Sequence, residues 1–133
     1  MPRMSFVDLR VYQMAKAIGD AVWDAVQGWR PLARDTVGKQ IIRAADSIGA
    51  NIAEGYGRGS YQDNRRFVRI ARGSLYETRH WLRRAYNRKL LTESETENLK
   101  TLVANLGPQL NAYLKSIGSN SRRKSSSSLP NDE

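Results

Sequence analysis

The sequence predicts an all-α, up-and-down antiparallel four-helix bundle. Four segments carry apolar residues at three- and four-residue spacing, which places those residues on one face of a helix at about 100° per residue. Short connections that contain helix-capping and helix-stopping residues separate the segments. No segment alternates polar and apolar residues with the period of two that is typical of strands. These observations favour helices that fold back on one another around a single core.

The first predicted helix ends near Gly28 and Pro31, because glycine weakens a helix and proline cannot continue one. Its predicted core stripe consists of Val7, Val11, Met14, Ala15, Ile18, Val22, Ala25, Val26 and Trp29.

The second helix is predicted to begin near Asp35 or Thr36, since both residue types cap helix N-termini. Its predicted core stripe consists of Val37, Ile41, Ala44, Ala45, Ile48 and Ile52. The helix then meets three glycines within residues 55–60, which read GYGRGS. A phosphate-binding loop would need a strand before these glycines, but a helix precedes them here. We therefore expect left-handed glycines to stop the helix and to form a hinge.

Ser60 is the expected N-cap of the third helix, with Asp63 placed nearly as in a capping box, and the pattern fades over residues 87–91. The predicted core stripe of this helix consists of Phe67, Ile70, Ala71, Ser74, Thr78, Trp81, Leu82 and Ala85.

Thr92 is the expected N-cap of the fourth helix, which should kink at Gly107-Pro108 and stop at Gly118. The predicted core stripe of this helix consists of Leu99, Leu102, Val103, Leu106, Leu110, Tyr113, Leu114 and Ile117. We thus expect a bundle domain over residues 1–118 and a disordered, serine- and arginine-rich tail over residues 119–133.

The charge of the chain favours a polyanionic partner. The sequence has 22 Lys and Arg residues against 13 Asp and Glu residues, which gives a net charge of +9. Such an excess suits nucleic acid, although a basic surface can also serve solubility alone. We expect a cytoplasmic protein without a membrane segment, because no apolar run approaches the roughly 20 residues that a membrane helix needs.

Five arginines and one tyrosine recur along the third helix at helical spacing, and we call this set the arginine stripe. It consists of Arg65, Arg69, Arg72, Tyr76, Arg79 and Arg83. Helical projection predicts that the stripe lies opposite the core face of the helix. Aligned arginines repel one another, and a polyanion would offset that cost through phosphate contacts and release of counterions. The stripe therefore predicts binding of RNA or DNA, and Arg58, Arg66 and Arg84 should extend it.

An alternative interpretation has these arginines paired with acids of neighbouring helices or subunits. Tyr76, likewise, could stack on an unpaired base or merely cover arginine stems. The sequence leaves both alternatives open.

No residue pattern predicts an enzyme. The chain lacks cysteine, and its single histidine, His80, has no evident catalytic partner. The carboxylates of Asp46, Glu54, Asp63 and Glu77 do not follow a metal-binding spacing. We therefore expect no catalytic residue, metal or cofactor.

Residues 47–60 read SIGANIAEGYGRGS, and residues 65–78 read RRFVRIARGSLYET. These two stretches resemble the signature of the bacterial 23S rRNA-intervening-sequence proteins, and the resemblance covers about residues 6–117. It implies a homopentameric barrel of four-helix bundles. The family includes Avd, the basic accessory protein of diversity-generating retroelements that binds nucleic acid and a reverse transcriptase. The motif is closer to the intervening-sequence branch, whereas the charge and the arginine stripe are closer to the accessory branch.

The residues themselves also allow an oligomer. Tyr12 and Trp23 lie beside the core stripe of the first helix as a second apolar strip, and Glu54 and Glu77 are candidates for pairing with arginines of another subunit. We thus expect a non-enzymatic, homo-oligomeric protein that binds nucleic acid, most specifically as an accessory factor to a reverse transcriptase. The competing expectation is a structural or protein-interaction oligomer.

Overall fold

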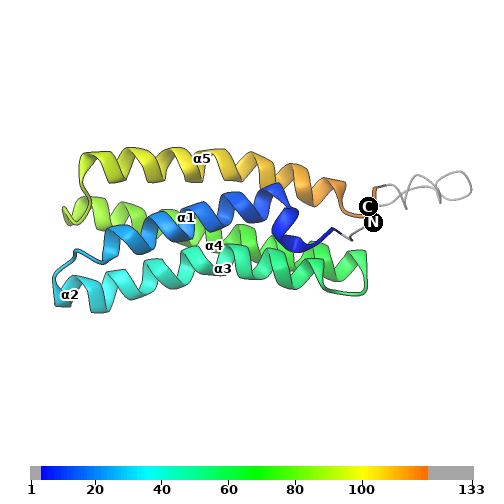
Figure 1. Ribbon diagram of the computed structural model, residues 1–133, viewed down its shortest axis with the longest axis horizontal. Helices are drawn as coiled ribbons and strands as arrows, with labels where there is room; N and C mark the ends of the chain where they lie inside the picture. The colour runs from blue at the N-terminus through cyan, green and yellow to red at the C-terminus, as the bar shows by residue number, and fades with distance from the viewer. Residues whose placement is uncertain (1–3, 120–133) are drawn as a thin grey trace, which may run out of the picture.

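Four long helices form the molecule, which is seen here in a computed structural model that describes residues 4–119. The helices α1 (Arg10–Val26), α3 (Lys39–Tyr56), α4 (Tyr61–Asn87) and α5 (Glu93–Ser116) run side by side in alternating directions (Figure 1). The described residues contain no strand. The predicted all-α four-helix bundle is confirmed, whereas the predicted disordered tail lies outside the described residues from position 120 onward.

The chain enters α1 through a short 3-10 helix, η1 (Phe6–Asp8), which the sequence analysis did not anticipate. Ser5 caps this turn, and the Asp8 carboxylate accepts a hydrogen bond from the Ser5 backbone N–H at 2.9 Å. Val7 consequently lies outside α1 and has 49% of its surface exposed. Its assignment to the core stripe was wrong, because Val7 belongs to the separately capped turn η1 and α1 begins only at Arg10.

The second helical run begins earlier than predicted. It starts at Pro31 as α2 (Pro31–Ala33), continues as the π-helix η2 (Arg34–Gly38) and leads directly into α3. Proline suits the first helical position because its missing N–H would have no helical partner there. Thr36 donates its hydroxyl to the Leu32 carbonyl oxygen at 2.7 Å, as a residue inside a helix does. Neither Asp35 nor Thr36 is therefore the N-cap.

The close approach of α3 and α4 needs a glycine near the end of α3. Gly57 ends α3 with φ of −81°, and none of the three glycines in residues 55–60 has a positive φ. The expected left-handed stop was therefore wrong. A Cβ at Gly55 would lie 2.7 Å from Asn64 Oδ1 and 2.9 Å from Phe67 Cβ, so α4 approaches α3 too closely for a side chain there.

Helix α4 presents a different core face from the one predicted. Ser60 caps it as expected, through a hydrogen bond from the Asp63 N–H. Val68 and Leu75 are buried although the sequence analysis omitted them, whereas Ile70 is 42% exposed. The buried residues of α4 are Val68, Ala71, Leu75, Thr78 and Ala85. The centre of the core face is thus rotated toward α5.

Helix α5 follows the prediction closely. Thr92 and Glu95 form a capping box at its start, and the helix continues through Pro108. Gly118 follows its last residues with φ of 78°, the left-handed conformation expected of a stopping glycine. Its buried residues are Leu99, Val103, Leu106 and Leu110.

The core runs along the axis of the bundle. Helix α3 lies between α1 and α4, and α5 closes the other side against α1 and α4. Helix α4 packs much more extensively on α3 than on α5, which leaves the seam between α4 and α5 more open. None of the helices in residues 4–119 combines the length and apolar content needed to cross a lipid bilayer.

Candidate nucleic-acid interface

The arginine stripe lies on the flank of α4, beside α5. Counting about 100° per residue, its mean direction is roughly 110° from that of the buried residues of α4. The predicted position opposite the core was therefore wrong, because that prediction centred the core on the Phe67 side. Arg65 and Arg72 are half-buried, whereas Arg69, Arg79 and Arg83 are exposed.

Part of the stripe joins α4 to α5. Arg65 donates from Nη1 to the Ile117 carbonyl oxygen at 2.9 Å, at the end of α5. Arg72 donates from Nη1 to Asn111 Oδ1 at 3.1 Å. These two arginines bridge the seam that apolar packing leaves open, so part of the stripe has a structural role.

The remaining arginines of the stripe have no acidic partner among residues 4–119. The carboxylates of Asp20, Glu54 and Asp63 pair with Lys16, Arg58 and Arg66, respectively, instead. Arg79 lies 5.7 Å from the centre of the Tyr76 ring, and Tyr76 itself is 62% exposed. Arg69, Arg79 and Arg83 thus form a cationic surface whose charge is not neutralised by the described part of the chain.

Arg58 and Arg66 form a separate group around Phe67. Their guanidinium carbons lie 4.7 and 4.6 Å from the centre of the Phe67 ring, and Arg58 also pairs with Glu54 at 3.2 Å. Phe67 lies against Gly55 of α3, so Arg58 is on the Phe67 side of α4 and not on the flank that carries the arginine stripe. Half-buried Arg84 falls on the same side of the helical projection as Arg66.

The predicted oligomer residues have different surroundings. Tyr12 is half-buried, with its ring 4.9 Å from that of Phe6 and packed against Gly49, so it has a packing role within the chain. Glu54 is paired with Arg58, which lies in the connection that follows α3. Trp23 is 55% exposed and Glu77 is exposed, so these two remain accessible to another subunit.

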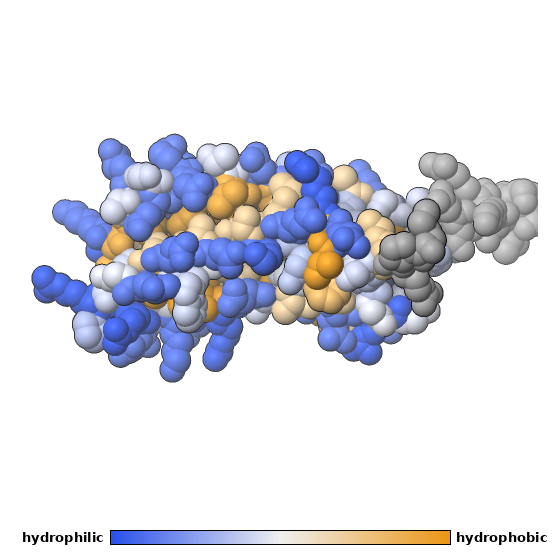
Figure 2. Space-filling model, in the orientation of Figure 1, coloured by the Kyte–Doolittle hydropathy of each residue, from blue (hydrophilic) through white to orange (hydrophobic). Residues whose placement is uncertain are grey.

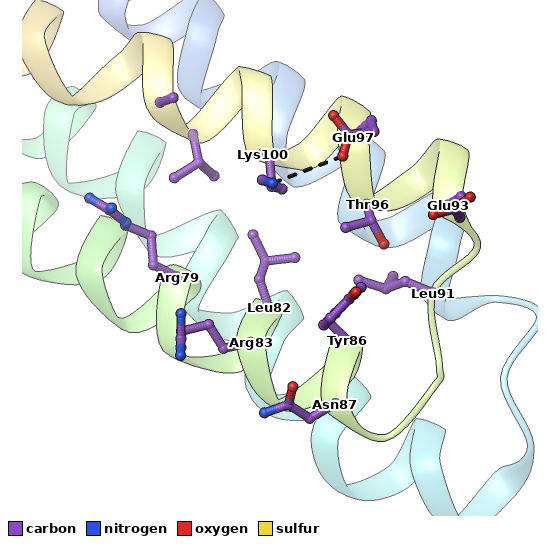
Figure 3. Close-up of a pocket in the computed structure, with 12 residues that line it drawn as sticks. Arg79, Leu82, Arg83, Tyr86, Asn87, Leu91, Glu93, Thr96, Glu97 and Lys100 are labelled. Carbon is purple, nitrogen blue, oxygen red and sulfur yellow. Dashed lines mark ion pairs between the residues drawn. The ribbon is translucent and has the colours of Figure 1, made fainter.

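A groove that the sequence analysis missed lies between α4 and α5 at the end of the arginine stripe. Its volume is about 530 Å³, and Arg79, Arg83 and Lys100 are among its lining residues (Figure 3). Apolar side chains of Leu82, Leu91, Val103 and Ala104 also line it. Its remaining lining residues are Tyr86, Asn87, Glu93, Thr96 and Glu97.

Helix register explains the groove. On α4 the long side chains of Arg79 and Arg83 line the seam (Figure 3), and on α5 the small side chain of Ala104 is among the lining residues. Long charged side chains do not fill a seam as apolar ones do. Sequence carries one signal for this site, because Tyr86 continues the stripe three residues beyond Arg83.

Neither the single histidine nor Asp46 is among the residues that line the groove. His80 packs edge-on against Trp81 at 4.8 Å, and residues 4–119 hold no cluster of His, Asp and Glu suited to a metal ion. Partial desolvation, together with the charge of Asp20, raises the pKa of the Asp46 carboxyl. Asp46 lies on α3, whereas the stripe lies on α4.

Comparison with known proteins agrees with the fold. The sequence model of the family described as 23S rRNA-intervening sequence protein matches residues 7–112. A crystal structure of a protein of unknown function from Bacteroides thetaiotaomicron, of the S23 ribosomal protein family, superposes with a TM-score of 0.70. It is 22% identical and covers 80% of this chain and 99% of its own. No curated protein matches the sequence.

Proposed function

The chain belongs to the 23S rRNA-intervening sequence protein family, and we propose that it is a non-enzymatic protein that binds RNA or DNA through the arginine stripe of α4. The observation that carries this proposal is the absence of acidic partners for Arg69, Arg79 and Arg83 within the described chain. Phosphate groups would neutralise these cations, and Arg69 and Arg83 are exposed enough to reach them.

The binding would depend on backbone charge more than on base sequence. Arginines at helical spacing follow a line of phosphates, but the described residues contain no helix-turn-helix that would place a helix in the major groove. We therefore expect affinity that falls steeply with salt and varies little with sequence.

The proposal includes a homo-oligomer, and the resemblance implies a pentamer. Trp23 and Glu77 are the accessible candidates for its contacts. Figure 2 shows apolar patches on the face formed by α5, α1 and α3, with hydrophilic side chains between and around them. Half-buried Met14 and Ala21 of α1 and Leu102 of α5 contribute to the apolar surface of these helices. A ring would repeat the stripe and raise avidity without new kinds of contact.

The most specific form of the proposal is an Avd-like accessory factor that binds a reverse transcriptase together with its nucleic acid in a diversity-generating retroelement. The net charge of +9 and the arginine stripe support this form. A reverse transcriptase gene beside the gene for this chain would be the genomic observation expected, and a position within a 23S rRNA gene would favour the other branch of the family.

A structural or protein-interaction oligomer is the second candidate function. The contacts of Arg65 and Arg72 with α5 favour it, because they show that arginines of the stripe also hold the bundle together. Under this candidate, the unpaired arginines would meet acids of another subunit.

A charge-reversal experiment separates the two candidates. Arg69→Glu combined with Arg83→Glu should lower affinity for a labelled 20-nucleotide RNA at least tenfold while leaving the oligomer intact. Arg10→Glu combined with Arg30→Glu is the matched control, since these arginines are exposed and lie outside α4. Light scattering on a sizing column measures the oligomer. Dissociation of the first variant alone, or equal affinities for both variants, would favour the second candidate.

A further inference from the structure

The groove between α4 and α5 has dimensions suited to a small group. Its volume of about 530 Å³ falls within the range of roughly 300–1,000 Å³ that is typical of sites for small ligands. A nucleic-acid duplex presents only its backbone and grooves to such a site, whereas a single strand can turn a base into it. A groove of this size can therefore receive a base from a single strand but not from a duplex.

The lining of the groove matches the separate parts of a nucleotide. Arg79 and Arg83 continue the arginine stripe to this groove, where their guanidinium groups suit phosphate. Leu82, Leu91 and Val103 supply apolar surface that phosphate alone would not use. Tyr86 lines the groove and is 60% exposed, so its ring is accessible for stacking.

The acidic residues of the groove argue against an acidic peptide. Glu93 and Glu97 are among its lining residues, and Glu97 lies 3.9 Å from the Lys100 ammonium. These carboxylates would repel acidic side chains but can accept hydrogen bonds from the amino groups of a neutral base. Asn87 and Thr96 offer further hydrogen-bonding groups. A nucleotide with its base inside the groove and its phosphates along the arginine stripe would place a neutral group near the carboxylates and negative charge near the arginines.

We propose that this groove receives one unstacked nucleotide of single-stranded RNA or DNA, whose neighbouring phosphates lie along Arg79 and Arg83. The inference rests on the proposed function, because the stripe brings the strand to the groove. It goes further by assigning a substrate class: the protein prefers single strands to duplexes of the same length.

Filling the groove without changing its charge tests the proposal. Ala104 is exposed on α5 and lines the groove, so Ala104→Phe should occupy it with little effect on the core. Ala112→Phe is the matched control, because Ala112 is also exposed on α5 but does not line the groove. Tyr86→Leu removes the aromatic ring and keeps an apolar side chain. Fluorescence anisotropy with a labelled 20-nucleotide single strand, and with the blunt duplex of the same sequence, measures the affinities of the full chain.

The wild-type chain should bind the single strand at least tenfold more tightly than the duplex at equal salt. Ala104→Phe and Tyr86→Leu should each weaken single-strand binding by about tenfold, with duplex binding nearly unchanged and Ala112→Phe behaving as wild type. Equal affinities of wild type for the two probes, or unchanged single-strand binding by Ala104→Phe, would overturn the inference. So would binding of an acidic amphipathic 15-residue peptide that Ala104→Phe abolishes while oligonucleotide binding remains.

The two proposals fail in different ways. If the groove idea alone is wrong, the groove variants bind as wild type does, while Arg69→Glu with Arg83→Glu still loses affinity. If the proposed function is wrong, the charge-reversal variant and its control bind equally.

Discussion

Arg65 near the start of α4 donates a hydrogen bond from Nη1 to the Ile117 carbonyl oxygen at 2.9 Å, which connects α4 to the end of α5. Arg65→Leu should lower the free energy of unfolding by about 1–3 kcal/mol, as expected for a lost hydrogen bond to a charged group. Arg83→Leu is the control, since Arg83 is exposed and makes no such bond within the described chain. Urea unfolding measures both. Equal losses would contradict a structural role specific to Arg65.

Replacement by alanine should destabilise the chain at Gly55 and stabilise it at Gly73. A Cβ at Gly55 would lie 3.0 Å from the Asn64 backbone oxygen and 2.9 Å from Phe67 Cβ, so Gly55→Ala should force α3 and α4 apart and cost about 1–3 kcal/mol. Nothing lies within 4 Å of a Cβ at Gly73, and Gly73→Ala should gain about 0.5–1 kcal/mol through helix propensity. Thermal unfolding measures both variants. A stabilised Gly55→Ala would show that the helices can separate without cost.

Lys89 ends α4 in the left-handed region, with φ of 61°. Its N–H donates to the Tyr86 carbonyl, and the Leu90 N–H donates to the Ala85 carbonyl, as in a Schellman motif. Lys89→Gly should therefore stabilise the chain by about 1 kcal/mol, because glycine adopts this conformation without steric cost. Arg88→Gly is the control, since Arg88 has φ of −91° and should gain nothing. Denaturant unfolding should show a gain in stability for Lys89→Gly and none for Arg88→Gly.

Asp46 should make stability depend on pH in the acid range. Partial desolvation, with a smaller contribution from the charge of Asp20, raises the pKa of Asp46 above its ordinary value of 3.8. The folded state then binds the proton more tightly than the unfolded state, so the stabilisation from protonated Asp46 is present below pH 3.8 and is lost as the pH rises through the raised pKa. The Lys16 ammonium lies 3.1 Å from the Asp20 carboxylate, so this cation is engaged with Asp20 and not with Asp46.

Asp46→Asn should consequently be more stable than wild type at pH 7, with a difference that shrinks toward zero on acidification below pH 3.8. Removing an acid from a chain of net charge +9 would by itself favour the opposite sign, so the result is informative. Thermal unfolding across this pH range measures it. A difference that is constant with pH would contradict the raised pKa.

The elements whose signals are local could be predicted from the sequence. Ser60 and Thr92 cap their helices through hydrogen bonds to residues three positions ahead, which sequence spacing reveals. The predicted core residues of the second helical run, from Val37 in η2 to Ile52 in α3, are all buried as expected, because one narrow apolar stripe admits one orientation.

The orientation of α4 could not be predicted in the same way. Its apolar residues cover a wide arc, with Phe67 and Ile70 on one flank and Val68 and Leu75 on the other. Which flank is buried depends on how α4 packs between α3 and α5, and local periodicity does not contain that information. The groove depends in turn on the packing of α4 against α5 that brings Arg79, Arg83 and Ala104 to one seam.

The salt dependence of binding tests the central claim most directly. The affinity of wild type for a 20-nucleotide single strand should fall linearly on logarithmic axes of affinity and salt concentration, with a slope set by the number of phosphates neutralised. Replacing Arg69, Arg79 and Arg83 together with Gln should reduce the magnitude of that slope by about 2, at roughly 0.7 per contact on a single strand. A slope equal to that of wild type in an intact, folded variant would contradict binding of nucleic acid through the arginine stripe.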